Sequence, residues 1–206
     1  RFERQKPWMR VKLATSLDGK AALNNGQSKW LTGPDARLDG HAWRARSCAV
    51  LTGIGTVLAD DPQMNVRGID TPRQPKRFLI DAHLKLPLSA KIIPSEENPG
   101  SLGVFTLKDK DSEEAVKLIE RGIDIYTCPA KGNHVDLAFV VNQLASLSCN
   151  EVHVEAGGKL TAAMINEGLA DELLWYFAPK LIGPGQGLSL PEIHSLDDAQ
   201  SLQITD

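Results

Sequence analysis

Residues 50–67 read VLTGIGTVLADDPQMNVR, and this stretch decides the fold that we expect. The apolar run that ends at Leu51 predicts a buried strand, Gly53 and Gly55 predict a turn, and residues 57–59 predict a short helical segment. Glycines at the carboxyl end of a strand allow a phosphate or a sugar to approach the backbone, and the N–H groups of the next helical turn can bind an anion. The third glycine of the dinucleotide fingerprint is absent, so an ordinary strand-to-helix turn is the alternative interpretation.

A second stretch repeats this arrangement, because residues 151–155 read EVHVE and are followed by Gly157, Gly158 and a helical pattern. Ligands of a parallel sheet bind outside the carboxyl ends of its strands, so we expect Glu155 and Asp60 to face one crevice. Two such junctions on one crevice favour a cofactor that is rich in phosphate. His153 lies between two valines, and we expect it to be a core or face residue whose polar atoms are satisfied.

Strand and helix patterns alternate along the rest of the chain with short connections. The predicted strands are residues 9–14, 48–52, 77–81, 102–107, 123–128, 151–155 and 171–178, and the predicted helices are residues 35–47, 111–120, 135–147 and 159–167. This order predicts an α/β fold with a mostly parallel central sheet that helices flank on both faces. Residues 179–187 predict a glycine-rich loop, and residues 202–206 alternate as a strand does.

Length and composition indicate one globular domain over residues 1–206, with a linker-like start at residues 1–7. The 23 basic and 26 acidic residues give a net charge of −3, which provides no general attraction for nucleic acid. Three cysteines without zinc spacing favour reduced thiols, no metal site and a cytoplasmic location. No apolar run reaches the roughly 20 residues of a membrane helix. Both ends look cut, so we expect a piece of a longer protein.

Several motifs in one order resemble the reductase domain of bacterial riboflavin biosynthesis. They are KLATSLDGK at residues 12–20, GQSKW at 26–30, GIGTV at 53–57, EAGG at 155–158, DEL at 171–173 and PKLIG at 179–183, together with Arg44, Asp60, Pro62 and Arg67. The resemblance covers nearly the whole chain, and the shared order makes it more specific than any single motif.

This resemblance implies a dihydrofolate-reductase-like fold and the NADPH-dependent reduction of 5-amino-6-(5-phosphoribosylamino)uracil to its ribitylamino form. The expected partner is then the phosphorylated aminopyrimidine substrate. We expect the protein to bind neither nucleic acid nor a membrane. The resemblance also implies a homodimer and fusion to an amino-terminal zinc deaminase domain. The deaminase signature, His-x-Glu with Pro-Cys-x-x-Cys, does not occur in these residues, so this chain alone is not expected to deaminate.

The resemblance assigns a role to each matching residue. The residues implied in the reductase step are Lys12, Asp60 and Glu155. The residues implied in NADPH binding, with the glycines of the first turn, are Ala14, Trp30, Gly53, Gly55, Thr56, Asp60, Gly157, Gly158, Lys159 and Leu160. The residues implied in substrate binding are Ser28, Arg44, Met64, Arg67 and Glu155. Two positions depart from the family pattern, since Ala82 replaces a common serine that contacts the cofactor and Met64 replaces a common leucine.

The implied chemistry suits these residue types. A sugar C1′ bonded to nitrogen opens to an imine, a hydride from the nicotinamide reduces that carbon, and Lys12 or Asp60 can relay the accompanying proton. A planar guanidinium matches phosphate oxygens, so we expect Arg44 and Arg67 to bind the 5′-phosphate of the substrate. By analogy with the fold, we expect the peptide bond between residues 157 and 158 to be cis.

Two other functions remain open from the sequence. A dihydrofolate reductase needs an acid for its pterin, for which Asp35 and Asp39 are candidates, but this function leaves the two arginines unexplained. A non-catalytic nucleotide-binding domain of the same fold is the second alternative, and the joint presence of the three polar residues of the reductase step argues against it. The preference for NADPH over NADH is also open, with Lys108 and Lys110 as candidates for a contact to the 2′-phosphate.

Overall fold

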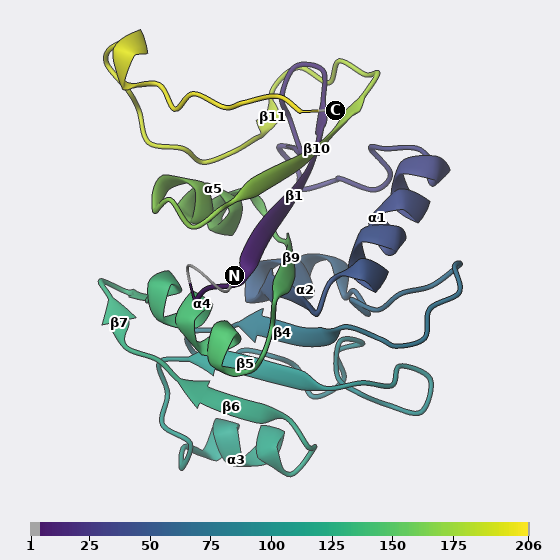
Figure 1. The fold of residues 1–206 in the computed structure, drawn as a ribbon, viewed down its shortest axis with the longest axis vertical. Coiled ribbons are helices and arrows are strands. Elements are labelled where there is room, and N and C mark those ends of the chain that lie inside the picture. The colour runs from purple at the N-terminus through teal and green to yellow at the C-terminus, as the bar shows by residue number, and fades with distance from the viewer. Residues whose placement is uncertain (1–4, 206) are drawn as a thin grey trace.

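The computed structural model describes residues 5–205 and is organised around one seven-stranded sheet (Figure 1). The strands lie in the order β10-β1-β9-β3-β4-β5-β6, and each neighbouring pair is parallel. Their bounds are β1 Trp8–Ser16, β3 Ala49–Gly53, β4 Lys76–Ile80, β5 Leu102–Thr106, β6 Asp124–Thr127, β9 Glu151–Glu155 and β10 Glu172–Ala178. The predicted α/β fold with a mostly parallel sheet is confirmed.

Helices and loops cover both faces of the sheet, because its central strands are apolar on both sides. The helices are α1 Pro34–Arg46, α2 Ile54–Asp60, α3 Glu113–Ile119, α4 Leu137–Ser146 and α5 Gly158–Asn166. Helices α4 and α5 share one apolar cluster with Leu51 and Val154, while α2 and α3 share another with Val50 and Leu79. Successive residues of a strand point to opposite faces, so Val50 and Leu51 of β3 contribute to different clusters.

Helix α1 meets the sheet through charged and aromatic side chains instead of an apolar face. None of its 13 residues is fully buried. The Trp43 ring lies against Arg10 of β1, with the guanidinium carbon 4.1 Å from the ring centroid, and Arg44 forms an ion pair with Glu155 at the end of β9. Polar groups are therefore concentrated where α1 adjoins β1 and β9.

The strand order places Lys12 beside Glu155. The two residues are register partners in the parallel pair of β1 and β9, and paired residues on neighbouring strands point to the same face. Ala14, two residues further along β1, points to that face as well and is paired with Tyr176 of β10. Residues expected at the reductase step and at the cofactor thus share one face of the sheet.

The structure confirms most predicted elements to within a few residues and corrects three of them. The helix predicted over residues 135–147 is wrong at its start, because His134–Val135 form β8, which pairs with β7 (Ala130–Lys131), and Asp136 caps α4. The glycine-rich loop of residues 179–187 contains β11 (Gly185–Gln186), which pairs with β2 (Ala22–Leu23).

The third correction concerns the end of the chain. The strand predicted over residues 202–206 does not form in its described part, residues 202–205, where no strand pairs with this segment to satisfy its backbone. A short 3-10 helix, Leu196–Asp198, precedes it. Residue 206 and residues 1–4 of the predicted linker lie outside the described residues.

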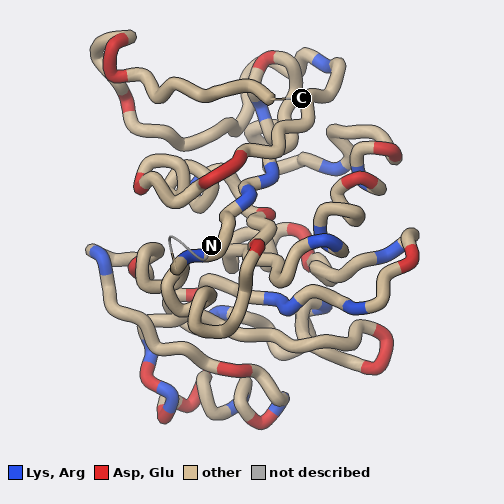
Figure 2. Tube along the Cα trace, viewed as in Figure 1, with Lys and Arg blue, Asp and Glu red and all other residues tan. Residues whose placement is uncertain are grey.

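Acidic and basic residues are interspersed along the chain trace, as Figure 2 shows, in keeping with the small net charge. Within residues 5–205, no helix combines the length and the apolar character that a bilayer crossing requires.

Candidate active site

The two glycine junctions predicted from the sequence lie in contact. The backbone N–H of Gly157 donates a hydrogen bond to Thr56 Oγ1 at 3.1 Å. A Cβ added to Gly53 would lie 3.2 Å from Leu160 Cδ2, which shows how closely the end of β3 packs against the first turn of α5. The carboxyl ends of β3 and β9 are therefore joined directly, as the prediction of one shared crevice requires.

Helix α5 begins at this contact without a side-chain cap. Gly157 is its N-cap residue, and no side chain accepts a hydrogen bond from its first turn. Gly158 must be glycine, because an added Cβ would lie 2.4 Å from the carbonyl oxygen of Gly187. The predicted cis bond between residues 157 and 158 is wrong, since the cis bond that occurs in the described chain joins Lys29 and Trp30.

The carboxylate of Glu155 forms the centre of a buried charged cluster. Arg44 donates to both of its oxygens, with Nη2 2.9 Å from Oε2, and donates from Nη1 to the carbonyl oxygen of Asn65 at 2.9 Å. His153 is fully buried, as expected, but it is not satisfied as expected, because neither ring nitrogen forms a hydrogen bond within the described chain and Nε2 lies 3.3 Å from Glu155 Oε1. Burial alone would raise the pKa of Glu155, but Arg44 holds that pKa well below its usual range, so the pair is ionised.

Lys12 lies next to this cluster, because it is the register partner of Glu155 on the neighbouring strand β1. Its ammonium nitrogen lies 5.6 Å from the ring centroid of Tyr176, two residues beyond its register partner Leu174 on β10. The Tyr176 hydroxyl donates to the carboxylate of Asp39 on α1. Burial and then this carboxylate raise the pKa of Tyr176, so the phenol stays protonated and links β10 to α1.

Arg67 is the arginine that remains exposed at this site. Its Nη1 donates to Gln63 Oε1 at 2.8 Å and also to the side-chain oxygen of Asn65. Burial and the nearby Arg44 lower the pKa of Arg67. Because Arg44 is already engaged by Glu155 and Asn65, the geometry favours Arg67 over Arg44 as the ligand of an incoming anion.

The loop of residues 24–33 contacts both helix α2 and the segment that follows β10. Lys29 forms an ion pair with Asp60 at 3.0 Å, so Asp60, at the end of α2, is held by this loop. Trp30 is 66% exposed, its ring lies 4.6 Å from the Arg37 guanidinium carbon, and its carbonyl oxygen accepts a hydrogen bond from Lys180 at 3.2 Å. The exposed indole provides a flat apolar surface next to charged groups.

The remaining predicted residues differ in how open they are to a ligand. Gly55 and Lys159 are exposed, and Ser28 is partly exposed. Met64 is only 3% exposed and belongs to the apolar cluster beneath α2, with a φ of 52°. Its side chain therefore packs in the core and is not open to a ligand.

Two residues at the site were missed in the sequence. Asn65 bridges Arg44 and Arg67, and His41 accepts the backbone N–H of Arg67 through Nδ1 at 3.1 Å. The spacing of His41 and Arg44, three residues apart in a predicted helix, places both on one helix face and is the signal that would have found His41.

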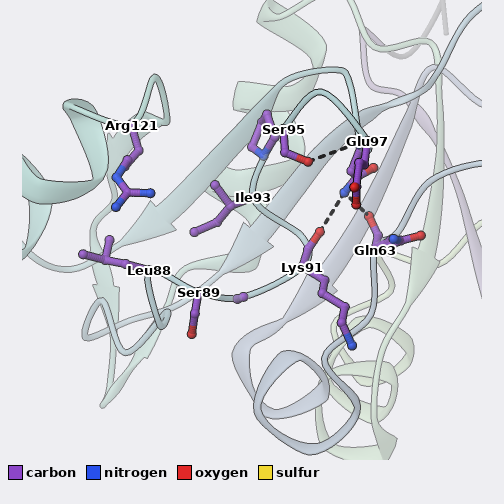
Figure 3. A pocket seen from close by; sticks show the side chains of 11 residues that line it. Gln63, Leu88, Ser89, Lys91, Ile93, Ser95, Glu97 and Arg121 are labelled. Atoms are coloured by element: carbon purple, nitrogen blue, oxygen red, sulfur yellow. Dashed lines mark hydrogen bonds between the residues drawn. The ribbon is translucent and has the colours of Figure 1, made fainter.

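A pocket of about 280 Å³ lies against the segment between β4 and β5 (Figure 3), and Gln63, whose side chain holds Arg67, is one of the residues that line it. Asn98 ties this segment together by donating to the carbonyl oxygens of Lys91 at 2.7 Å and of Gln63 at 3.3 Å. None of the described residues that line this pocket is among those predicted to bind cofactor or substrate.

Comparison with known proteins gives a consistent result. The family model described as RibD C-terminal domain matches residues 7–205. The chain is 34% identical over 200 residues to the riboflavin biosynthesis protein RibD of Aquifex aeolicus, and this covers 97% of the chain and 53% of that relative. The chain thus spans about half the length of the curated relatives that it matches.

Solved structures agree with this match. Acinetobacter baumannii RibD, form 1, superposes with a TM-score of 0.85 at 35% identity over 98% of this chain and 55% of that one. A diaminohydroxyphosphoribosylaminopyrimidine deaminase/5-amino-6-(5-phosphoribosylamino)uracil reductase from Thermotoga maritima gives a TM-score of 0.81 at 24% identity over 99% and 54%, which is a likeness of fold. These structures have the dihydrofolate-reductase-like fold, and the expected fold is confirmed.

Proposed function

Because this chain belongs to the RibD C-terminal domain family, we propose that it reduces 5-amino-6-(5-phosphoribosylamino)uracil with NADPH, as the reductase part of a riboflavin-biosynthesis enzyme. One observation carries the proposal. The ion pair of Arg44 and Glu155 lies beside Lys12, at the place where Thr56 joins two glycine junctions. This arrangement combines an anion-binding backbone with a fixed carboxylate and an amine.

The residues present fit a dinucleotide cofactor. The first turn of α5 carries N–H groups that have no acceptor within the helix, and Lys159 adds a cation there. An added Cβ at Gly55 would meet nothing within 4 Å, so the first turn of α2 is open at this residue. We assign the phosphates of NADPH to these groups, and one of its rings to the exposed face of Trp30. When bound, NADPH supplies the hydride that reduces C1′ of the substrate.

Lys12 is the residue that we assign to proton transfer. Opening of the ribose ring to an imine requires a proton to move between the ring oxygen and the nitrogen, and a flexible amine is suited to this step. Asp60 is the other candidate, but it is already paired with Lys29 at 3.0 Å. Glu155, held ionised by Arg44, orients the polar groups of the substrate beside Lys12.

Arg67 is the residue that we assign to the 5′-phosphate. Arg67 is an exposed residue, and its guanidinium is fixed by Gln63 and Asn65 through a single nitrogen, Nη1. A guanidinium held in this way loses little freedom when it binds a phosphate. Arg44 acts instead on Glu155, because three of its five N–H donors are already engaged by Glu155 and Asn65.

The test is the loss of reduced-nicotinamide absorbance when the aminopyrimidine phosphate is added, measured with NADPH and with NADH. Arg67→Ala should raise the KM for the pyrimidine about 10- to 100-fold, because charged hydrogen bonds are lost. Arg121→Ala is the matched control and should leave KM unchanged, because Arg121 is an exposed arginine to which we assign no ligand contact. No oxidation with the pyrimidine, or oxidation with dihydrofolate instead, would refute the function, and an unchanged KM in Arg67→Ala would refute the phosphate role.

The proposal extends to the whole protein and its assembly. The relatives are about twice as long as this chain, which supports a fused zinc deaminase domain. Strand β10 lies at an edge of the described sheet, where Trp175 and Phe177 stack with their centroids 5.1 Å apart and Phe177 is 56% exposed. We assign the homodimer contact to this edge, which sedimentation velocity tests.

The free cysteines fit a cytoplasmic location.

A further inference from the structure

His41 occupies a position that connects α1 to the segment carrying Arg67. It is partly buried on α1, one turn before Arg44. Its ring nitrogen Nδ1 accepts the backbone N–H of Arg67 at 3.1 Å. This hydrogen bond joins residues that are 26 positions apart, and it fixes the backbone of the residue that we assign to the substrate phosphate.

Neighbouring contacts show that α1 holds the whole segment of residues 65–68. Arg44 Nη1 donates to the carbonyl oxygen of Asn65 at 2.9 Å. At the other end, the Leu38 side chain lies near Gly68, since a Cβ added to that glycine would be 3.6 Å from Leu38 Cδ1. Residues at positions 38, 41 and 44 lie on one side of the helix. His41 and Arg44 therefore hold this segment through two hydrogen bonds.

The charges around His41 keep Nδ1 available as an acceptor. Only an unprotonated nitrogen can accept a hydrogen bond, so the ring must be neutral with its proton on Nε2. Burial, followed by the positive charges of Arg44 and Arg67, lowers the pKa of His41, while Glu155 and the Asn65 backbone oppose that shift with smaller effects. The ring is consequently neutral near pH 7.

These contacts fix both the side chain and the backbone of Arg67. The guanidinium is held by Gln63 and Asn65, and the backbone is held by His41. Without the last contact, the segment would have to be ordered when the substrate binds, and the free energy of that ordering would weaken binding.

From these contacts we propose that His41 is a positioning residue, whose Nδ1 fixes the Arg67 backbone so that the Arg67 side chain can bind the phosphate of the substrate. The inference rests on the proposed function and adds to it. His41 contacts no reacting atom in this role, and it acts through Arg67 alone.

The test compares His41→Leu with His41→Asn. Leucine removes the acceptor, whereas the Oδ1 of asparagine lies near the position of Nδ1 and can accept the same N–H. Loss of one hydrogen bond should raise the KM for the pyrimidine about 3- to 10-fold in His41→Leu. The kcat and the KM for NADPH should remain close to those of the wild type, and His41→Asn should restore most of the lost affinity.

Hydrogen exchange at the Arg67 amide provides a readout that needs no substrate. Exchange should be faster in His41→Leu than in the wild type, and His41→Asn should return it toward the wild-type rate. Unchanged exchange in His41→Leu, or faster exchange with an unchanged pyrimidine KM, would overturn the positioning role. A wild-type protein that does not oxidise NADPH with the pyrimidine would instead overturn the proposed function itself, and the two failures are thus distinguished.

Discussion

Replacing Arg44 by methionine is the change that tests the charged cluster most directly. Methionine keeps much of the aliphatic volume but removes the cation that neutralises Glu155. The side chains of Arg44 and Glu155 are each only 14% exposed, so water cannot replace the lost partner. The substitution also removes the hydrogen bond to the carbonyl oxygen of Asn65, and with it one tie between α1 and the segment of residues 65–68.

The expected loss of stability follows from this burial. Breaking a buried ion pair by removing one partner costs about 3–5 kcal/mol in the free energy of unfolding. Glu155 can take up a proton once Arg44 is gone, so we expect the lower end, about 3 kcal/mol at neutral pH. Arg46→Met is the matched control on the same helix. Arg46 is 60% exposed, its Nε lies 3.3 Å from Glu151, and an exposed pair of this kind contributes less than about 1 kcal/mol.

The assay is urea denaturation followed by tryptophan fluorescence, which the four tryptophans of the chain permit. Glu155→Gln and the double variant with Arg44→Met complete a thermodynamic cycle. Because the two residues act as a pair, the double variant should be less destabilised than the sum of the single changes, by about 1–3 kcal/mol. The view that Arg44 and Glu155 act as a buried pair would be refuted by either of two results. Arg44→Met and Arg46→Met could lower the free energy of unfolding equally, or the effects of Arg44→Met and Glu155→Gln on that free energy could be additive.

Three further predictions concern other parts of the structure. Gly158→Ala should lower the melting temperature and impair NADPH binding, since its Cβ would meet the Gly187 carbonyl oxygen at 2.4 Å; an unchanged melting temperature in calorimetry would contradict this. Burial raises the pKa of the Cys128 thiol to about 11. In the native protein Cys128 should therefore react with a disulfide reagent more slowly than the less buried Cys48, and equal labelling of the two cysteines in peptide maps would contradict this prediction. The pKa of Glu155 is lower folded than unfolded, so its contribution to stability is complete above the ordinary value of 4.5 and is lost as the pH falls through the folded value. Urea titrations below about pH 5 should accordingly show a steeper loss for wild type than for Glu155→Gln, and parallel curves would exclude that linkage.

Much of the fold and of the site's outline was readable from local patterns. The strand of residues 151–155 was predicted with both ends correct, because an apolar run bounded by a loop and two glycines has few other solutions. The start of α4 was missed, because residues 134 and 135 pair with β7 and only a partner strand makes them extended. The cis bond expected at residues 157–158 occurs instead at residues 29–30, and nothing in the local residue types distinguished the two positions.

The sequence by itself determined the α/β class, the two strand–glycine–helix junctions and the residue types of the site, because these depend on hydrophobic period and on local backbone freedom. Only the tertiary structure decided that Lys12 lies beside Glu155, that Arg44 is used by Glu155 while Arg67 remains open, and that His41 supports Arg67. The order of strands and the docking of α1 set these contacts between residues as far as 143 positions apart. Such pairing is fixed by the burial of the whole sheet, which no short stretch of sequence contains.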